Sequence, residues 1–201
     1  TVVAFASDHG EMLGDHQWLR KRNPFEASAR VPYLFRFPKS INIPQQKVID
    51  KPVELMDLMP TFLDIAGVGI PDTVDGQSLL PLMRDPESGW REFVHGECCN
   101  VPSANSGMQF LTDGKRKFVW FPGKDEELYF DLETDPDELH NLIDDPERVR
   151  EIAAWRGHLI AQLRNRPEGF TDGKRLIKQD GPTTPVLRDV IVQAESIKNG
   201  E

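Results

Sequence analysis

Cysteine is scarce in this chain of 201 residues: it has two, Cys98 and Cys99, and they are adjacent. Because a neighbouring pair rarely bridges to itself, the sequence indicates no disulfide framework and favours a reducing compartment such as the cytoplasm. Long apolar runs are also missing, which excludes a transmembrane helix and predicts no membrane partner. Basic residues are in the minority, with 24 Lys and Arg against 33 Asp and Glu. The resulting net charge of -9 argues against non-specific binding to nucleic acid.

The sequence shows no initiating methionine and no leader. Instead, residues 1–6 already form an apolar stretch typical of a buried strand. A strand this apolar needs neighbours on both sides. We therefore expect the chain to be the C-terminal part of a larger protein, whose missing N-terminal portion is its partner.

Hydrophobic patterning predicts a mixture of strands and helices over residues 1–90. Residues 31–38, bounded by prolines, favour a second strand. Apolar residues at helical spacing predict a helix that begins near Asp57 and stops at Gly67. A short helix is expected over residues 79–84.

From about residue 91 the pattern changes to short strands, which are expected at 92–98, 108–112, 117–121 and 127–132. Asp113-Gly114 predicts a hairpin turn between two of them. Residues 147–164 predict a helix with an apolar stripe that includes Val149. Residues 91–165 therefore favour a small antiparallel sheet packed by one helix. Residues 166–201 read as an extended tail with an apolar patch at 186–192.

Asp8 and His9, directly after the first strand, are candidate metal ligands. On a regular strand they would point to opposite faces, so both can meet one ion only if the chain leaves the strand there. Gly10 suits such a bend because glycine tolerates positive φ and close approach of the backbone. An ionised Asp8 offers an oxygen ligand and a neutral His9 offers a nitrogen, and a metal held by them can act as a Lewis acid. The alternative is a loop in which both residues make only turn hydrogen bonds.

Lys21 lies in the same long loop, residues 7–30, and is the candidate catalytic and substrate-binding cation. A fixed ammonium is most useful where negative charge develops in a transition state. Beside a metal it indicates chemistry on a sulfate or phosphate ester. The alternative is that Arg20-Lys21-Arg22 is a solvated run of charge.

Other polar residues have weaker signals. Asp15 and His16 repeat the Asp-His pairing, but a turn and support of the loop explain them as well. His95 and Glu97 lie two residues apart on an expected strand and so share a face, which could line a substrate pocket. A half-buried strand with mixed polar residues is the alternative for His95. No neighbouring motif marks Cys98 as an activated nucleophile.

The sequence resembles the type I sulfatases of the alkaline phosphatase superfamily. Residues 7–16, Lys21 and residues 25–32 are similar to the family's second signature region. The similarity continues through three further blocks, residues 57–67, 75–81 and 127–142. Altogether it covers about residues 1–145. It implies the C-terminal part of an α/β, alkaline-phosphatase-like mixed-sheet sandwich, followed by the small antiparallel sheet with its packed helix.

The resemblance also implies roles for individual residues. In the family, the residues that match Asp8 and His9 bind a divalent metal, usually calcium, and the residue that matches Lys21 contacts the sulfate ester. The imidazole of His9 leaves manganese or zinc open as alternatives to calcium. The family's nucleophile is a formylglycine made within a Cys/Ser-x-Pro-x-Arg motif, which this chain does not contain.

We therefore expect the formylglycine and the remaining metal ligands in the portion that precedes this chain. The function expected of the full-length protein is hydrolysis of a small-molecule sulfate ester by an arylsulfatase-like enzyme. The alternatives are a phosphonate or phosphate ester hydrolase of the same superfamily, or a catalytically inert fragment. The isolated chain is expected to be inactive because it lacks the nucleophile.

Overall fold

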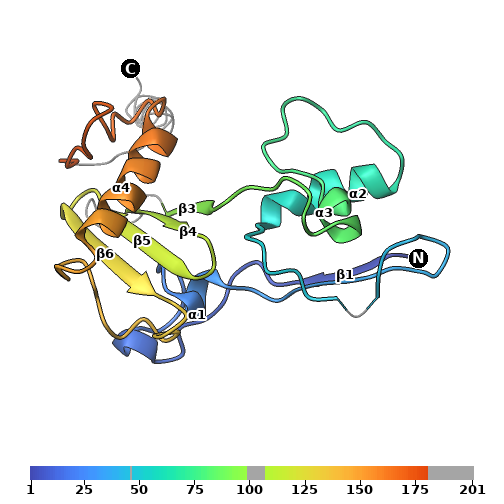
Figure 1. The fold of residues 1–201 in the computed structure, drawn as a ribbon, viewed down its shortest axis with the longest axis horizontal. Coiled ribbons are helices and arrows are strands. Elements are labelled where there is room, and N and C mark those ends of the chain that lie inside the picture. The colour runs from blue at the N-terminus through green and yellow to red at the C-terminus, as the bar shows by residue number, and fades with distance from the viewer. Residues whose placement is uncertain (46, 99–106, 181–201) are drawn as a thin grey trace, which may run out of the picture. The chain divides into compact units, whose positions relative to one another are not determined.

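The computed structural model describes residues 1–45, 47–98 and 107–180, which fall into two compact units. The first unit contains Thr1–Lys21, Phe25–Val94 and Thr112–Gly114. The second contains Arg22–Pro24, His95–Leu111 and the described residues from Lys115 onward. Figure 1 shows the helices and strands of both units.

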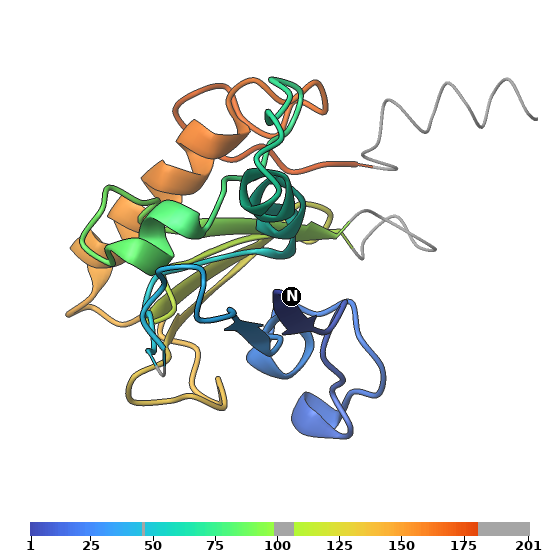
Figure 2. The same ribbon diagram turned by 90° about the vertical axis from the view of Figure 1, so that its right-hand side faces the viewer.

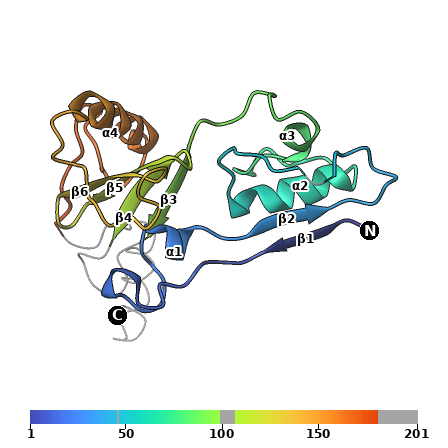
Figure 3. The same ribbon diagram turned by 60° about the horizontal axis from the view of Figure 1, so that its bottom comes forward.

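The first unit is built on a two-stranded sheet. Strand β1 (Val3–Ala6) pairs antiparallel with β2 (Tyr33–Arg36), and Phe5 lies opposite Leu34. Figure 3 shows the two strands side by side, with α2 next to them. The connection between them contains the short 3-10 helix η1 (Asp15–Gln17) and the single-turn helix α1 (Glu26–Ala29).

The expectation that the first strand is buried is wrong for one of its faces. Val3 and Phe5 are 55% and 62% exposed, and Leu34 beside them is also exposed. Side chains alternate along a strand, so these three share one face, which no other part of the described chain covers. The opposite face carries Phe35, which packs with the buried cluster of Phe37, Ile43 and Leu80.

The helices of the first unit follow the sequence pattern. The 3-10 turn η2 (Leu55–Asp57) leads into α2 (Leu58–Ile65), and α3 (Leu80–Arg84) follows after a loop. Gly67 has a φ of +69° and donates its N–H to the carbonyl of Asp64. Glycine adopts this left-handed conformation without strain, so Gly67 is the predicted helix stop.

The second unit is a four-stranded sheet with one long helix. The strands β3 (Val94–Cys98), β4 (Met108–Thr112), β5 (Arg116–Phe121) and β6 (Glu126–Asp131) lie side by side in that order. Strands β5 and β6 are antiparallel, and Gly114, with a φ of +87°, forms the predicted turn before β5. The strands therefore follow one another across the sheet in the order of the sequence.

Helix α4 (Val149–Leu163) lies across one face of this sheet, as the two views in Figure 1 and Figure 2 agree. The helix buries three of its own apolar side chains, Ile152, Leu159 and Leu163. Val149, expected in the apolar stripe, is 60% exposed because it is the first residue of the helix and lies beyond the edge of the packed stripe. Arg156 adds a two-pronged ion pair with Glu127 of β6.

The segment after α4 packs onto the same unit as far as it is described. Phe170 is buried and its ring meets the ring of Trp120 edge to face, 5.8 Å apart. The apolar patch expected at residues 186–192 lies outside the described residues. Within the described ranges, no helix is both long and apolar enough to span a membrane.

Candidate functional site

Three polar side chains of the first unit converge after β1. The Nε2 atom of His9 lies 3.3 Å from Oδ2 of Asp8 and 2.5 Å from Nζ of Lys21. Ser7 bends the chain at this point, since its hydroxyl donates a hydrogen bond of 2.7 Å to the carbonyl of His9. The chain has left the strand, which is the condition under which Asp8 and His9 could meet one ion, and the two residues share one side of the loop.

The hydrogen bonds of His9 determine which ring nitrogen is open to a ligand. Its Nδ1 lies 2.6 Å from the carbonyl oxygen of Gly10. A carbonyl can only accept a hydrogen bond, so Nδ1 carries the proton and Nε2 presents the lone pair, to which Lys21 Nζ donates in this structure. Histidines that bind metals use this same arrangement, in which a backbone carbonyl holds the far nitrogen and fixes the ring.

The spacing of the donor atoms fits a shared cation. Two ligands about 2.3 Å from one ion and at right angles to each other lie roughly 3.3 Å apart, close to the observed separation of Asp8 Oδ2 and His9 Nε2. The side chain of Asp8 is 82% exposed, so its carboxylate is accessible. Within residues 1–45, 47–98 and 107–180, no three His, Cys, Asp or Glu side chains gather closely enough to hold a metal alone.

Gly10 is required at its position by close backbone contact. Its N–H donates to the carbonyl of Ser28 at 2.9 Å, which joins the beginning of the loop to its end. A Cβ atom at this position would lie 2.0 Å from the carbonyl oxygen of Ala27. The bend does not use the tolerance of glycine for positive φ, since Gly10 is not among the left-handed residues. The expectation of a close approach is confirmed.

The loop holds an unusual concentration of strained backbone. Five non-glycine residues have φ between 49° and 75°: Leu13, His16, Gln17, Arg20 and Arg22. Each costs on the order of 1–2 kcal/mol, and such conformations persist only where the surrounding structure enforces them. Two of the five, Arg20 and Arg22, flank Lys21, so part of the strain lies directly beside the candidate catalytic cation.

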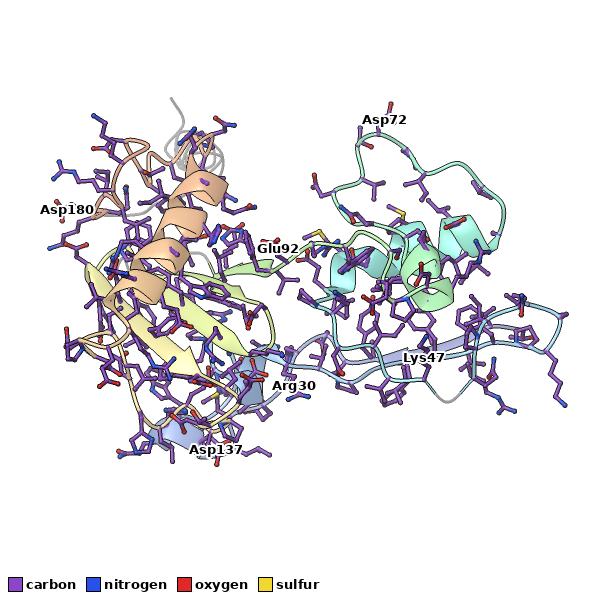
Figure 4. All side chains as sticks on the ribbon, viewed as in Figure 1. Arg30, Lys47, Asp72, Glu92, Asp137 and Asp180 are labelled. Carbon is purple, nitrogen blue, oxygen red and sulfur yellow. The ribbon has the colours of Figure 1, made fainter. Side chains whose placement is uncertain are left out.

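Two contacts support this loop. The rings of His16 and Phe25 are stacked, with centroids 3.8 Å apart. Glu26, the first residue of α1, forms an ion pair of 3.9 Å with Arg30, the residue just after the helix, which is labelled in Figure 4. These contacts agree with the supporting roles that the sequence suggested for His16 and for the loop.

His95 lies in the second unit, within a polar network. Its Nε2 is 2.7 Å from Oε1 of the buried Gln109, whose amide nitrogen donates to Glu97. Glu97 in turn pairs with Arg166, beyond the end of α4. Burial lowers the pKa of His95 below its usual value. Its role in substrate binding stays a prediction.

Sequence reasoning missed a buried ion pair in the second unit. Lys117 of β5 is entirely buried, and its Nζ lies 2.8 Å from Oε1 of Glu138 and 2.7 Å from the carbonyl oxygen of Pro24. The sequence feature that could have indicated this ion pair is the lysine at the start of the apolar run 117–121. If the sheet is buried on both faces, a lysine at that position is enclosed and needs a partner for its charge.

Comparison with known proteins identifies the family. The model for the C-terminal domain of N-sulphoglucosamine sulphohydrolase matches residues 14–166. The chain belongs to this sulfatase family. It is 45% identical over 179 residues to an arylsulfatase of Clostridium perfringens, an alignment that covers 89% of this chain and 37% of that protein.

Solved structures agree with this assignment. The structure of BT4656, in complex with its substrate D-glucosamine-2-N,6-O-disulfate, matches with a TM-score of 0.71 and 26% identity, covering 83% of this chain and 35% of that one. A phosphonate monoester hydrolase of Agrobacterium radiobacter matches with a TM-score of 0.69 and 27% identity, covering 80% and 34%.

These likenesses confirm the resemblance to type I sulfatases and the fold class, namely the C-terminal part of an alkaline-phosphatase-like α/β fold. The chain spans about a third of the length of the relatives it matches. The functions of Asp8, His9 and Lys21 in this protein stay predictions.

Proposed function

We propose that the full-length protein is a sulfuric-ester hydrolase and that this chain supplies one side of its active site. One observation carries the proposal: Asp8 Oδ2, His9 Nε2 and Lys21 Nζ converge in a chain of the sulfatase family. We assign residues 1–90 to the catalytic α/β domain and residues 91–165 to a small C-terminal subdomain. Of the tail expected over residues 166–201, the described part, residues 166–180, packs onto that subdomain.

In this proposal Asp8 and His9 hold a divalent cation, with calcium as the first choice and manganese or zinc as alternatives. A cation bound there supplies Lewis-acid stabilisation of the ester oxygens. The carbonyl of Gly10 keeps the proton of His9 on Nδ1, so that the lone pair is on Nε2. This lone pair accepts from Lys21 Nζ in the structure, and it would bind the cation once Lys21 turns toward the ester. The other metal ligands and the formylglycine nucleophile come from the portion of the protein that precedes this chain.

Lys21 donates hydrogen bonds to the sulfate oxygens and stabilises the negative charge that develops as the ester bond breaks. The strained backbone on both sides of Lys21 supports this role, because strain is concentrated where geometry serves function. The substrate class is a small-molecule sulfate ester. A sulfated glucosamine is the first sugar to assay, since BT4656 has such a substrate.

The decisive experiment measures kcat and KM of the full-length protein on matched aryl sulfates, aryl phosphates and phenyl phosphonates. Lys21→Ala should lower sulfate hydrolysis about 100- to 1000-fold, whereas the exposed Lys39→Ala should leave it unchanged. Asp8→Asn should lower the metal content found by elemental analysis. If Lys21→Ala has normal kinetics, Lys21 does not belong to the active site.

A phosphonate or phosphate ester hydrolase is the second candidate. It is supported by the likeness to the phosphonate monoester hydrolase, which is as similar in sequence as the sulfated-sugar complex. Turnover of phenyl phosphonate above that of the aryl sulfate would favour it. A full-length protein that turns over neither ester would instead be the inert alternative.

A further inference from the structure

We propose that Lys117 is a positioning residue for hydrolysis: through a buried bond to the carbonyl of Pro24 it holds in place the loop that carries Lys21. This inference rests on the proposed function, because it takes Lys21 to be the group that contacts the ester. Lys117 itself contacts neither substrate nor metal in this proposal.

Lys117 is enclosed within the second unit. None of its side chain is exposed, which is rare for lysine unless its charge is paired. The ammonium meets the carboxylate of Glu138 at 2.8 Å and the carbonyl of Pro24 at 2.7 Å. It also lies 5.8 Å from the centroid of the Phe110 ring, in a favourable position for a cation.

Stability alone is a poor explanation for an ion pair at this position. Replacement of a buried pair by well-packed apolar residues is often neutral or stabilising. A methionine and a leucine would fill the space of Lys117 and Glu138, but neither could donate to the carbonyl of Pro24. The feature that only the lysine supplies is therefore a directional bond to the 22–24 segment.

That bond falls close to the candidate catalytic cation. Pro24 is three residues after Lys21, and on the other side the carbonyl of Arg20 accepts a bond of 2.8 Å from the N–H of Met12. Lys21 thus lies in sequence between two anchored carbonyls. Arg20 and Arg22, its immediate neighbours, are both left-handed and would relax if an anchor were released.

The test separates the Pro24 bond from the charge pair. Lys117→Met combined with Glu138→Leu removes both charges together, so no buried carboxylate is left unpaired. Glu138→Gln removes the ion pair but leaves Lys117 able to donate to Pro24. Positioning predicts that the double variant keeps its melting temperature and loses about 10- to 100-fold in kcat, and that Glu138→Gln melts earlier but keeps its kcat.

The same changes in a Lys21→Ala background show whether Lys117 acts through Lys21. If it does, the double variant causes no further loss there, because the positioned group is already gone. Unchanged kcat in the double variant, an equal loss in the Lys21→Ala background, or a folded but slow Glu138→Gln protein would each overturn the inference. A Lys21→Ala enzyme with normal kinetics would instead remove the proposed function on which it rests.

Discussion

Replacement of Gly10 by alanine tests whether the geometry of the loop produces the metal site. The new Cβ would lie 2.0 Å from the carbonyl oxygen of Ala27, whereas ordinary contact begins at 3.4 Å. The backbone must therefore move by about 1.4 Å, from 2.0 to 3.4 Å, because the contacted atom is backbone and cannot rotate away. Such a movement would break the bond from the Gly10 N–H to the Ser28 carbonyl.

The carbonyl of Gly10 also fixes the ring of His9, so the displacement would reach the candidate ligand directly. We expect Gly10→Ala to weaken metal binding about 10- to 100-fold, as loss of a supporting contact to a ligating histidine typically does. A misplacement of about 1 Å typically lowers the rate about 100-fold. Overpacking against the backbone should lower the free energy of unfolding by about 1–3 kcal/mol.

The assay measures metal by titration calorimetry and turnover by aryl sulfate hydrolysis, both on the full-length protein. Gly89→Ala is the matched control, because a Cβ there meets nothing within 4 Å and the residue has no positive φ. Gly14→Ala separates the effect of conformation, since its space is open but its φ is +111°. Normal metal affinity and normal turnover in Gly10→Ala would refute the reasoning that places the site in this loop.

Two further predictions concern stability. Arg91 contacts Glu54 and the fully buried Asp57, so Arg91→Met should lower the free energy of unfolding, measured by urea denaturation, by about 3–5 kcal/mol. As a control, replacement of the exposed Arg84 by methionine should change it by less than about 0.5 kcal/mol. Equal effects of the two variants would contradict the burial argument. Burial lowers the pKa of His95, so below about pH 6.5 the unfolded chain binds more protons than the folded one and stability falls as pH falls. Thermal melting of His95→Gln between about pH 7 and pH 5 should show a smaller loss than the parent, and parallel curves would contradict the prediction.

The elements whose signals are local could be predicted from the sequence. Strand β4 has the predicted bounds, and the Asp113-Gly114 turn follows it, because alternation and turn chemistry act over a few residues. Helix α4 differs from its expected range by one or two residues at each end. Convergence of Asp8 and His9 could also be predicted, since two adjacent ligands after a strand can meet only through a bend.

Contacts between distant residues could not be predicted in this way. Lys117 meets Glu138 and also Pro24, which is 93 residues away, and no local periodicity specifies either partner. Asp57 meets Arg91 over 34 residues for the same reason. The exposed face of β1 could not be predicted, because apolar side chains on both faces of a strand indicate burial and no local signal marks the face that the described chain leaves uncovered.

The loop after β1 balances strain against its own hydrogen bonds. Its five left-handed residues together cost on the order of 5–10 kcal/mol, which is comparable with the whole stability of a domain. Nine backbone hydrogen bonds join residues of the loop, among them Gly10 to Ser28 and Met12 to Arg20, and at about 1 kcal/mol each they offset a cost of this size. The bond from Lys117 to the carbonyl of Pro24 comes from outside the loop, and its effect is on the position of the chain next to Lys21 rather than on stability. The sequence of the loop therefore predicts its chemistry, while the geometry that makes this chemistry possible depends on residues far along the chain.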